Sequence, residues 1–277
     1  MTSQPFVLKE GEEANFSFAP TPTYLFRLYT PKSKGRTSAN HVSSPASLNR
    51  RQGTRRIQYP SWQDILQLPP EIAAPRLSAH LLWGLSGCGG CCNLMSWSSS
   101  LLLVLQYGLY RHNHWRDRSP LSEMFIIMID TRGFPQRTFL RDLDALEYYF
   151  KLPKLDADLE TLKRLRLPGK ETYFGEYLTQ GYLEIEGHCC QVSMQQLIDT
   201  GLFKLCTFSD WDNWANPVLT IRRDYFLTEE TDIEQTRLAI LMGLINMEPR
   251  FAFPFAAMLL SLRARDTKDE TTRNGMV

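Results

Sequence analysis

Residues 94–110 read LMSWSSSLLLVLQYGLY, a short strand pattern followed by a segment that is apolar almost all round. The serines at 98–100 are placed to accept hydrogen bonds from the free N–H groups of a first helical turn. The apolar segment continues to about Arg111, and a helix without a polar face should be buried. The sequence therefore predicts a strand over 94–97 and a capped, buried helix after it.

Other elements follow on both sides of this stretch. Strands are predicted over 24–29 (YLFRLY), 124–129 (MFIIMI) and 173–183, the last with a break at Gly181. Helices are predicted over 61–68, ended by Pro69-Pro70, and over 72–82, 139–150 and 155–162. Two capping boxes, Ser193-x-x-Gln196 (with Gly201 closing its helix) and Thr231-x-x-Glu234, begin further helices. Strands and helices that do not alternate regularly predict an α+β fold.

Composition sets the class of protein. The chain has 277 residues, of which 43% are hydrophobic and 12% aromatic, enough to bury a substantial core. The longest aliphatic run is 101–105, far short of the roughly 20 residues that a membrane span needs. Residues 1–9 lack the basic start and apolar stretch of a signal peptide. We expect a soluble intracellular protein, cytoplasmic or nuclear.

The net charge is only +1, but its distribution is uneven. No Asp or Glu lies between Ala14 and Trp62, whereas eight cations do: Arg27, Lys32, Lys34, Arg36, Arg50, Arg51, Arg55 and Arg56. Such a segment can attract a phosphate-bearing ligand or a nucleic acid. The alternative is a solvated basic loop, because Ser, Asn, Pro and Gly crowd residues 31–54.

The six cysteines occur as Cys88, Cys91, Cys92, Cys189, Cys190 and Cys206. A zinc site would need four ligands, for which Cys88, Cys91, Cys189 and His188 are available. The C-x-x-C spacing is not repeated, however, so we expect reduced thiols and no metal. For each of the five histidines, at 41, 80, 112, 114 and 188, a surface or capping role is favoured over catalysis.

Polar residues interrupt three of the predicted strands. Arg27 lies inside YLFRLY, Ser96 and Ser98 flank Trp97, and Glu176 lies inside YFGEYL. A buried polar group destabilises a fold unless it has a partner. An arginine, two hydroxyls and a carboxylate can satisfy one another where strands converge, and the alternative is that each faces solvent.

The order of these residues resembles the arginine–serine–glutamate class of the ADP-ribosyltransferase superfamily, the group of the heat-labile enterotoxin, cholera and pertussis toxins. YLFRLYTPKS is similar to their leading strand, and LMSWSSSLLLVLQYGLY to their S-T-S strand and the following helix. GEYLTQGYL is similar to their catalytic strand, in which a glycine follows the glutamate by five positions, as Gly181 follows Glu176. An uncharacterised group of fungal proteins with this domain is also similar.

The resemblance implies a fold of small split sheets with helices around a central cleft, and NAD as substrate. It implies that Glu176, Ser96 and Arg27 are catalytic. Arg27 would hold the phosphates of NAD, and Ser96, supported by Ser98, would orient Arg27 and the ribose. Glu176 would stabilise the oxocarbenium-like transition state as nicotinamide departs. Trp97 would stack on nicotinamide, or else belong to the core.

The sequence also departs from this group. Members that modify arginine carry Glu or Gln two residues before the catalytic glutamate, where this chain has Phe174. A literal E-x-E occurs later, at Glu184 and Glu186, but without the interval to glycine.

Two functions therefore remain open, beside a third and weaker interpretation as a structural accessory protein that binds no ligand. The first is mono-ADP-ribosyl transfer or NAD hydrolysis. The second is an inactive fold of this type that binds protein or nucleic acid through the basic run Arg50–Arg56. In both cases we expect a lead-in over 1–22, an ADP-ribosyltransferase-like domain over 23–210, a helical extension over 211–263 and a disordered tail over 264–277. The acceptor would be a protein or a nucleic acid that the sequence does not identify.

Overall fold

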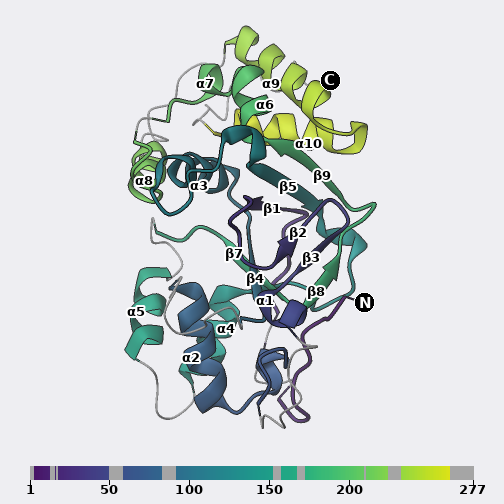
Figure 1. Ribbon diagram of the computed structural model, residues 1–277, viewed down its shortest axis with the longest axis vertical. Coiled ribbons are helices and arrows are strands. Elements are labelled where there is room, and N and C mark those ends of the chain that lie inside the picture. Colours follow the sequence, from purple (N-terminus) through teal and green to yellow (C-terminus); the bar gives the residue numbers. More distant parts are fainter. Residues whose placement is uncertain are drawn as a thin grey trace. The chain divides into compact units, whose positions relative to one another are not determined.

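The structure is a computed structural model that describes residues 3–12, 16, 18–49, 59–82, 92–151, 157–166, 172–208, 210–223 and 232–262. Within these residues the chain forms ten α-helices, a six-stranded antiparallel sheet and a three-stranded sheet, which confirms the α+β class (Figure 1). The basic run Arg50–Arg56 and the predicted tail lie outside the described residues.

The chain forms two compact units, and each is assembled from separate stretches of sequence. The first unit consists of Met1–Leu25, Ser33–Ser99 and Ile129–Cys189, and the second of Phe26–Lys32, Ser100–Met128 and Cys190–Val277.

The first unit contains three strands of the large sheet in the order β6 (Leu140–Arg141), β7 (Glu176–Gln180) and β4 (Leu94–Ser98). The small sheet has the order β2 (Arg36–Thr37), β3 (His41–Ser43) and β8 (Tyr182–Glu184). Gly181 joins β7 to β8 with a φ of 66°, a left-handed conformation that glycine adopts without steric cost. The predicted strand over 173–183 is thus confirmed from Glu176 onward, with its break at Gly181.

The helices of the first unit are α1 (Pro45–Leu48), η2 (Ile65–Gln67), α2 (Pro70–Leu81), η4 (Thr131–Gly133), α4 (Asp142–Phe150) and α5 (Ala157–Arg166). The short helix predicted over 61–68 is the single turn η2, which begins after its N-cap Asp64 and ends at Leu68, directly before Pro69-Pro70 as predicted. The same two prolines also begin the next helix, because Pro69 is the N-cap of α2 and Pro70 is its first helical residue. Proline is favoured at that position because the N–H that it lacks would have no helical partner.

Helices α2, α4 and α5 pack on one face of the β4–β7 pair. The buried cluster there includes Leu94 and Leu178 from the strands and Leu81, Leu146 and Leu162 from the three helices. Phe6, Leu8 and Phe16, from the N-terminal segment, are buried in the same cluster.

The second unit contains most of β1 (Tyr24–Tyr29), β5 (Phe125–Asp130) and β9 (Cys189–Ser193), in that order in the sheet. Its helices are α3 (Leu101–Asn113), η3 (Leu121–Glu123), α6 (Met194–Asp199), α7 (Leu202–Leu205), α8 (Asn216–Arg223), α9 (Ile233–Asn246) and α10 (Pro249–Leu260).

Two of the predicted caps are confirmed in this unit. The Ser100 hydroxyl accepts a hydrogen bond from the N–H of Leu103 at the start of α3. Both hydrogen bonds of the Ser193–Gln196 capping box are present at the start of α6. The cap predicted for α9 was wrong, because Asp232 is the N-cap there and Thr231 lies outside the described residues.

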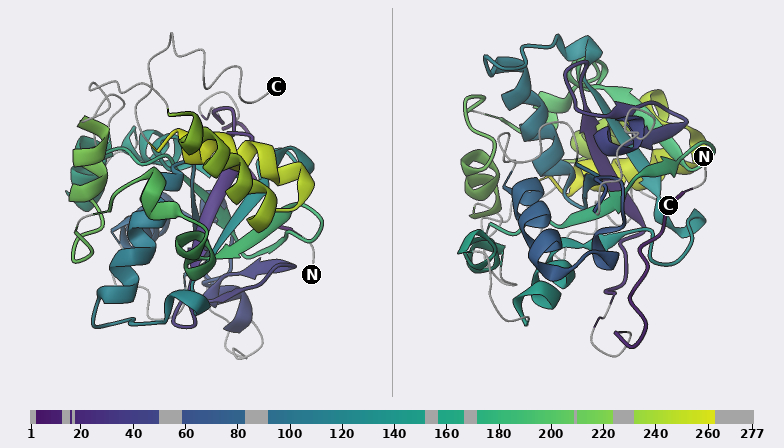
Figure 2. Two further views of the ribbon diagram at one scale, coloured as in Figure 1. Left: turned by 90° about the horizontal axis from the view of Figure 1, so that it is seen from above. Right: turned by 60° about the horizontal axis from the view of Figure 1, so that its bottom comes forward.

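Helices α9 and α10 pack against each other (Figure 2). They approach closely at Gly243, where an added Cβ would lie 2.4 Å from the Ala252 carbonyl oxygen. In the part of the chain that the structure describes, every helix is too short or too polar to cross a membrane.

Candidate active site

The antiparallel pairing of β4 with β7 places the serines beside the glutamate. Ser98, the last residue of β4, is directly opposite Glu176, the first residue of β7, and Ser96 is opposite Leu178. Directly opposed residues share a face, and residues two apart on a strand also share one. Ser96, Ser98 and Glu176 therefore lie on a single face, the one covered by α2, α4 and α5.

Each serine has a defined partner. The Ser98 hydroxyl donates to the Phe174 carbonyl oxygen at 2.8 Å, which fixes the backbone just before Glu176. The Ser96 Oγ lies 2.8 Å from His80 Nε2, and His80 Nδ1 lies 3.1 Å from the Cys92 Sγ. His80 is thus a neighbour of the predicted site rather than a surface residue. It connects the end of α2 to the middle of β4.

Glu176 is held by Arg166, an arginine that no motif in the sequence singles out. Arg166 Nη1 donates to Glu176 Oε2 at 2.5 Å and to Asp142 Oδ2 at 2.6 Å, while Nη2 donates to the Leu81 carbonyl at 3.1 Å. The Asp142 side chain is fully buried, and those of Arg166 and Glu176 are 17% and 15% exposed. One guanidinium thus joins the ends of α2 and α5, the start of α4 and the start of β7.

Two carboxylates share this one cation. Asp142 Oδ1 and Glu176 Oε1 are both buried and have no hydrogen-bond partner among the described residues. Burial raises the pKa of Asp142 to about 7, a shift that Arg166 opposes and the neighbouring Glu176 charge reinforces. Burial acts to lower the pKa of Arg166, but the charges of Glu176 and Asp142 outweigh it and raise that pKa. Two of the four carboxylate oxygens in this cluster therefore lack a donor among the described residues.

The raised pKa of Asp142 predicts a specific pH dependence of stability. Between about pH 4 and pH 7 the folded protein keeps a proton on Asp142 that the unfolded chain has released. The free energy of unfolding should therefore fall as the pH rises through this window, by at most about a few kcal/mol. Urea unfolding at pH 4–8 measures this, and the fall should be absent in Asp142→Asn. An equal pH slope in both proteins would contradict it.

Trp97 lies on the opposite face of β4 from Ser96 and Ser98. Its indole N–H donates to the Thr179 hydroxyl at 2.9 Å, and its ring meets Phe139 edge-on with 6.3 Å between centroids. Its side chain is 1% exposed, so it contributes to the core.

Arg27 lies on β1 in the second unit, whereas the serines and Glu176 lie in the first. Burial lowers the pKa of Arg27 to about 10, against a smaller effect of Tyr107 on α3. The guanidinium is still charged at neutral pH.

The remaining candidates lie apart from this cluster. Glu184 accepts a hydrogen bond from the Tyr182 hydroxyl at 2.7 Å, and both Glu184 and Glu186 are exposed. Cys88 and Cys91 lie outside the described residues, and no disulfide joins the four cysteines that the structure describes, Cys92, Cys189, Cys190 and Cys206, to one another. Among the described residues, no three His, Cys, Asp or Glu side chains are placed to hold a metal.

No protein-family model, no curated protein and no solved structure matches this chain. The resemblance therefore rests on the motifs themselves and on their geometry.

Proposed function

We propose that this protein is an ADP-ribosyltransferase-like NAD-binding enzyme that cleaves the bond between nicotinamide and ribose. The observation that carries the proposal is the pairing of Ser98 with Glu176, with Ser96 on the same face. This pairing brings together two motifs that lie about 80 residues apart in the sequence. The order of the motifs along the chain does not by itself place them side by side.

The orientation of Glu176 suits this chemistry. Arg166 holds Oε2, whereas the buried Oε1 has no hydrogen-bond partner among the described residues, so a ribose hydroxyl that reaches this position would find an acceptor there. In the reaction the bond from C1′ to the nicotinamide nitrogen breaks, and its electron pair leaves with neutral nicotinamide. Positive charge develops on the ribose ring, and a fixed carboxylate stabilises it without reorganising. An oxygen or nitrogen nucleophile then donates an electron pair to C1′ and releases its proton to solvent.

Phe174 favours water as that nucleophile. An aromatic side chain two residues before Glu176 cannot polarise a guanidinium acceptor, and the Phe174 carbonyl is already engaged by Ser98. We therefore infer NAD hydrolysis, rather than transfer to arginine, as the principal reaction.

The resemblance assigns Arg27 to the diphosphate of NAD, which an arginine binds through bidentate, charge-assisted hydrogen bonds. The test measures NAD affinity by calorimetry and nicotinamide release by chromatography. The wild type should bind NAD and release nicotinamide, and Arg27→Ala should weaken binding by about 10-fold or more, as expected when a charged hydrogen bond is lost. Arg237→Ala, at an exposed position on α9, is the matched control and should change neither the affinity for NAD nor the release of nicotinamide.

If the wild type neither binds nor cleaves NAD, the proposal fails. The inactive fold that binds protein or nucleic acid through Arg50–Arg56 then takes its place.

A further inference from the structure

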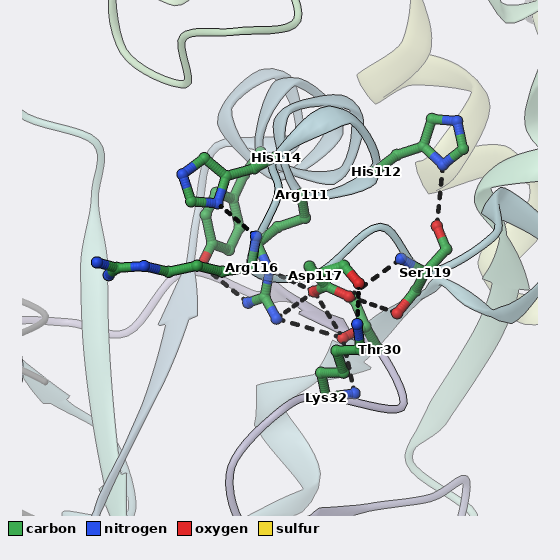
Figure 3. A network of polar contacts seen from close by, with 9 residues as sticks. Thr30, Lys32, Arg111, His112, His114, Arg116, Asp117 and Ser119 are labelled. Carbon is green, nitrogen blue, oxygen red and sulfur yellow. Dashed lines mark hydrogen bonds and ion pairs between the residues drawn. The ribbon is translucent and has the colours of Figure 1, made fainter.

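The loop that follows α3, residues 114–120, is organised around one buried carboxylate (Figure 3). The Asp117 carboxylate accepts hydrogen bonds from the Thr30 hydroxyl at 2.9 Å, the Arg111 Nε at 2.5 Å and the Ser119 N–H at 3.2 Å. The Ser119 hydroxyl also donates to it, and the Lys32 ammonium donates to the Asp117 carbonyl. The end of β1 and the end of α3 are thereby fixed to the same residue.

This network holds the backbone in an unfavourable conformation. Arg118 has a φ of 52°, in the left-handed region that a non-glycine residue rarely occupies. Its N–H donates to the Arg111 carbonyl at 3.2 Å, and Asp117 next to it is fixed on both sides. Strained backbone that many contacts maintain is typical of segments that present side chains for binding.

The outer side of the loop presents an aromatic ring together with cations. Trp115 is 67% exposed, and it is the sole large hydrophobic side chain in residues 111–120, all of which the structure describes. The Arg116 guanidinium lies 4.9 Å from the Trp115 ring centroid, and the Arg116 side chain extends away from the Asp117 network (Figure 3).

The charge of this surface is positive. Arg111 neutralises Asp117 inside the network, whereas Lys32, Arg116 and Arg118 are exposed. The Asp212 carboxylate accepts a hydrogen bond from the Asn113 amide at 2.5 Å where α3 ends, and Asp210 beside it is also exposed. Three exposed cations against these two carboxylates leave an excess of positive charge on this loop.

We propose that this loop binds single-stranded nucleic acid, with a base stacked on Trp115 and phosphates held by Arg116, Arg118 and Lys32. Stacking on an exposed ring needs an unpaired base, so a single strand is favoured over a duplex. A membrane surface is disfavoured, because interfacial binding needs several apolar side chains and this loop has one. The loop belongs to the second unit and shares no residue with the NAD site proposed above.

The test uses the full-length protein and a fluorescein-labelled 12-nucleotide oligothymidine, followed by fluorescence anisotropy. Trp115→Ala should weaken binding by about 5- to 150-fold, the usual effect of losing one aromatic stacking platform. Trp115→Phe should retain most of the affinity, because it keeps an aromatic face. Leu244→Ala, an equally exposed apolar position on α9, is the matched control and should have no effect.

Salt dependence tests the cations separately. Each phosphate contact on a single strand contributes about 0.7 to the slope of log affinity against log salt concentration. The double variant Arg116→Ala/Arg118→Ala should therefore reduce the slope by about 1 to 1.5, and Arg237→Ala should not.

Absence of oligonucleotide binding by the wild type overturns the proposal. Unchanged affinity in Trp115→Ala also overturns it, as does tighter binding to the duplex of the same sequence. Binding to vesicles containing phosphatidylserine, without binding to the oligonucleotide, would assign the loop to membranes instead.

Discussion

Replacing Glu176 by Gln is expected to slow nicotinamide release from NAD by about 10²–10³-fold while the affinity for NAD changes little. The amide keeps the size of the side chain and an oxygen that can accept from Arg166. It lacks the negative charge that stabilises the developing ribosyl cation. Asp142 still balances Arg166, so the fold should be retained. Single-turnover release measured beside equilibrium binding separates the loss of rate from a loss of affinity.

Glu184→Gln and Glu186→Gln are the matched controls. Both carboxylates are exposed, and both lie within ten residues of Glu176 along the chain. They should release nicotinamide at the wild-type rate. Full activity in Glu176→Gln, or its loss in Glu184→Gln or Glu186→Gln, would move the site to the later E-x-E.

Replacing Arg166 by Met should lower the free energy of unfolding by about 3–5 kcal/mol. The variant leaves two buried carboxylates close together without their shared cation, and it removes a donor from the Leu81 carbonyl. Denaturant unfolding at pH 8, above the pKa of Asp142 in the wild type, gives the largest difference. The effect should shrink at pH 5, since Asp142 is then protonated.

The control for this variant is Arg132→Met. Arg132 forms an ion pair with Asp130 at the same N–O distance of 2.6 Å, but its side chain is 69% exposed. An exposed pair contributes about 0–1 kcal/mol, so this substitution should have little effect. In an Asp142→Asn background, Arg166→Met should cost less than in the wild type. Equal costs in the two backgrounds would show that Arg166 and Asp142 do not interact.

Short-range signals predicted much of the fold. The apolar run 124–129 became β5, displaced by one residue, and the serines before α3 and α6 form the caps that their spacing indicates. The short strands β2, β3 and β6 were not predicted. Their two or three residues carry too little periodicity, and their existence depends on pairing with distant segments.

The strand pattern predicted only those residues of the site that lie on strands. Ser96, Ser98 and Glu176 could be selected because each is a polar residue in an apolar strand. Arg166 and Asp142 lie on charged or amphipathic helices, where a charged residue is ordinary and carries no signal. His80 lies near the end of α2, where its position gives no sign of a functional role. Its contact is with Ser96, which lies 16 residues further along the chain. Such contacts arise only when helices pack on a sheet.

The two units are completed at different times during synthesis of the chain. All three stretches of the first unit have been synthesised once Cys189 has been added, and they leave the ribosome before the end of the chain does, so that unit can fold while the last stretch is still being completed. The second unit needs the last stretch, Cys190–Val277, before α3 and β5 can reach α6 and β9. Until then the apolar α3 segment stays uncovered, and exposed apolar surface in a nascent chain promotes aggregation and chaperone binding. A premature stop codon after Cys189 would therefore yield a soluble first unit that is attached to an aggregation-prone remainder.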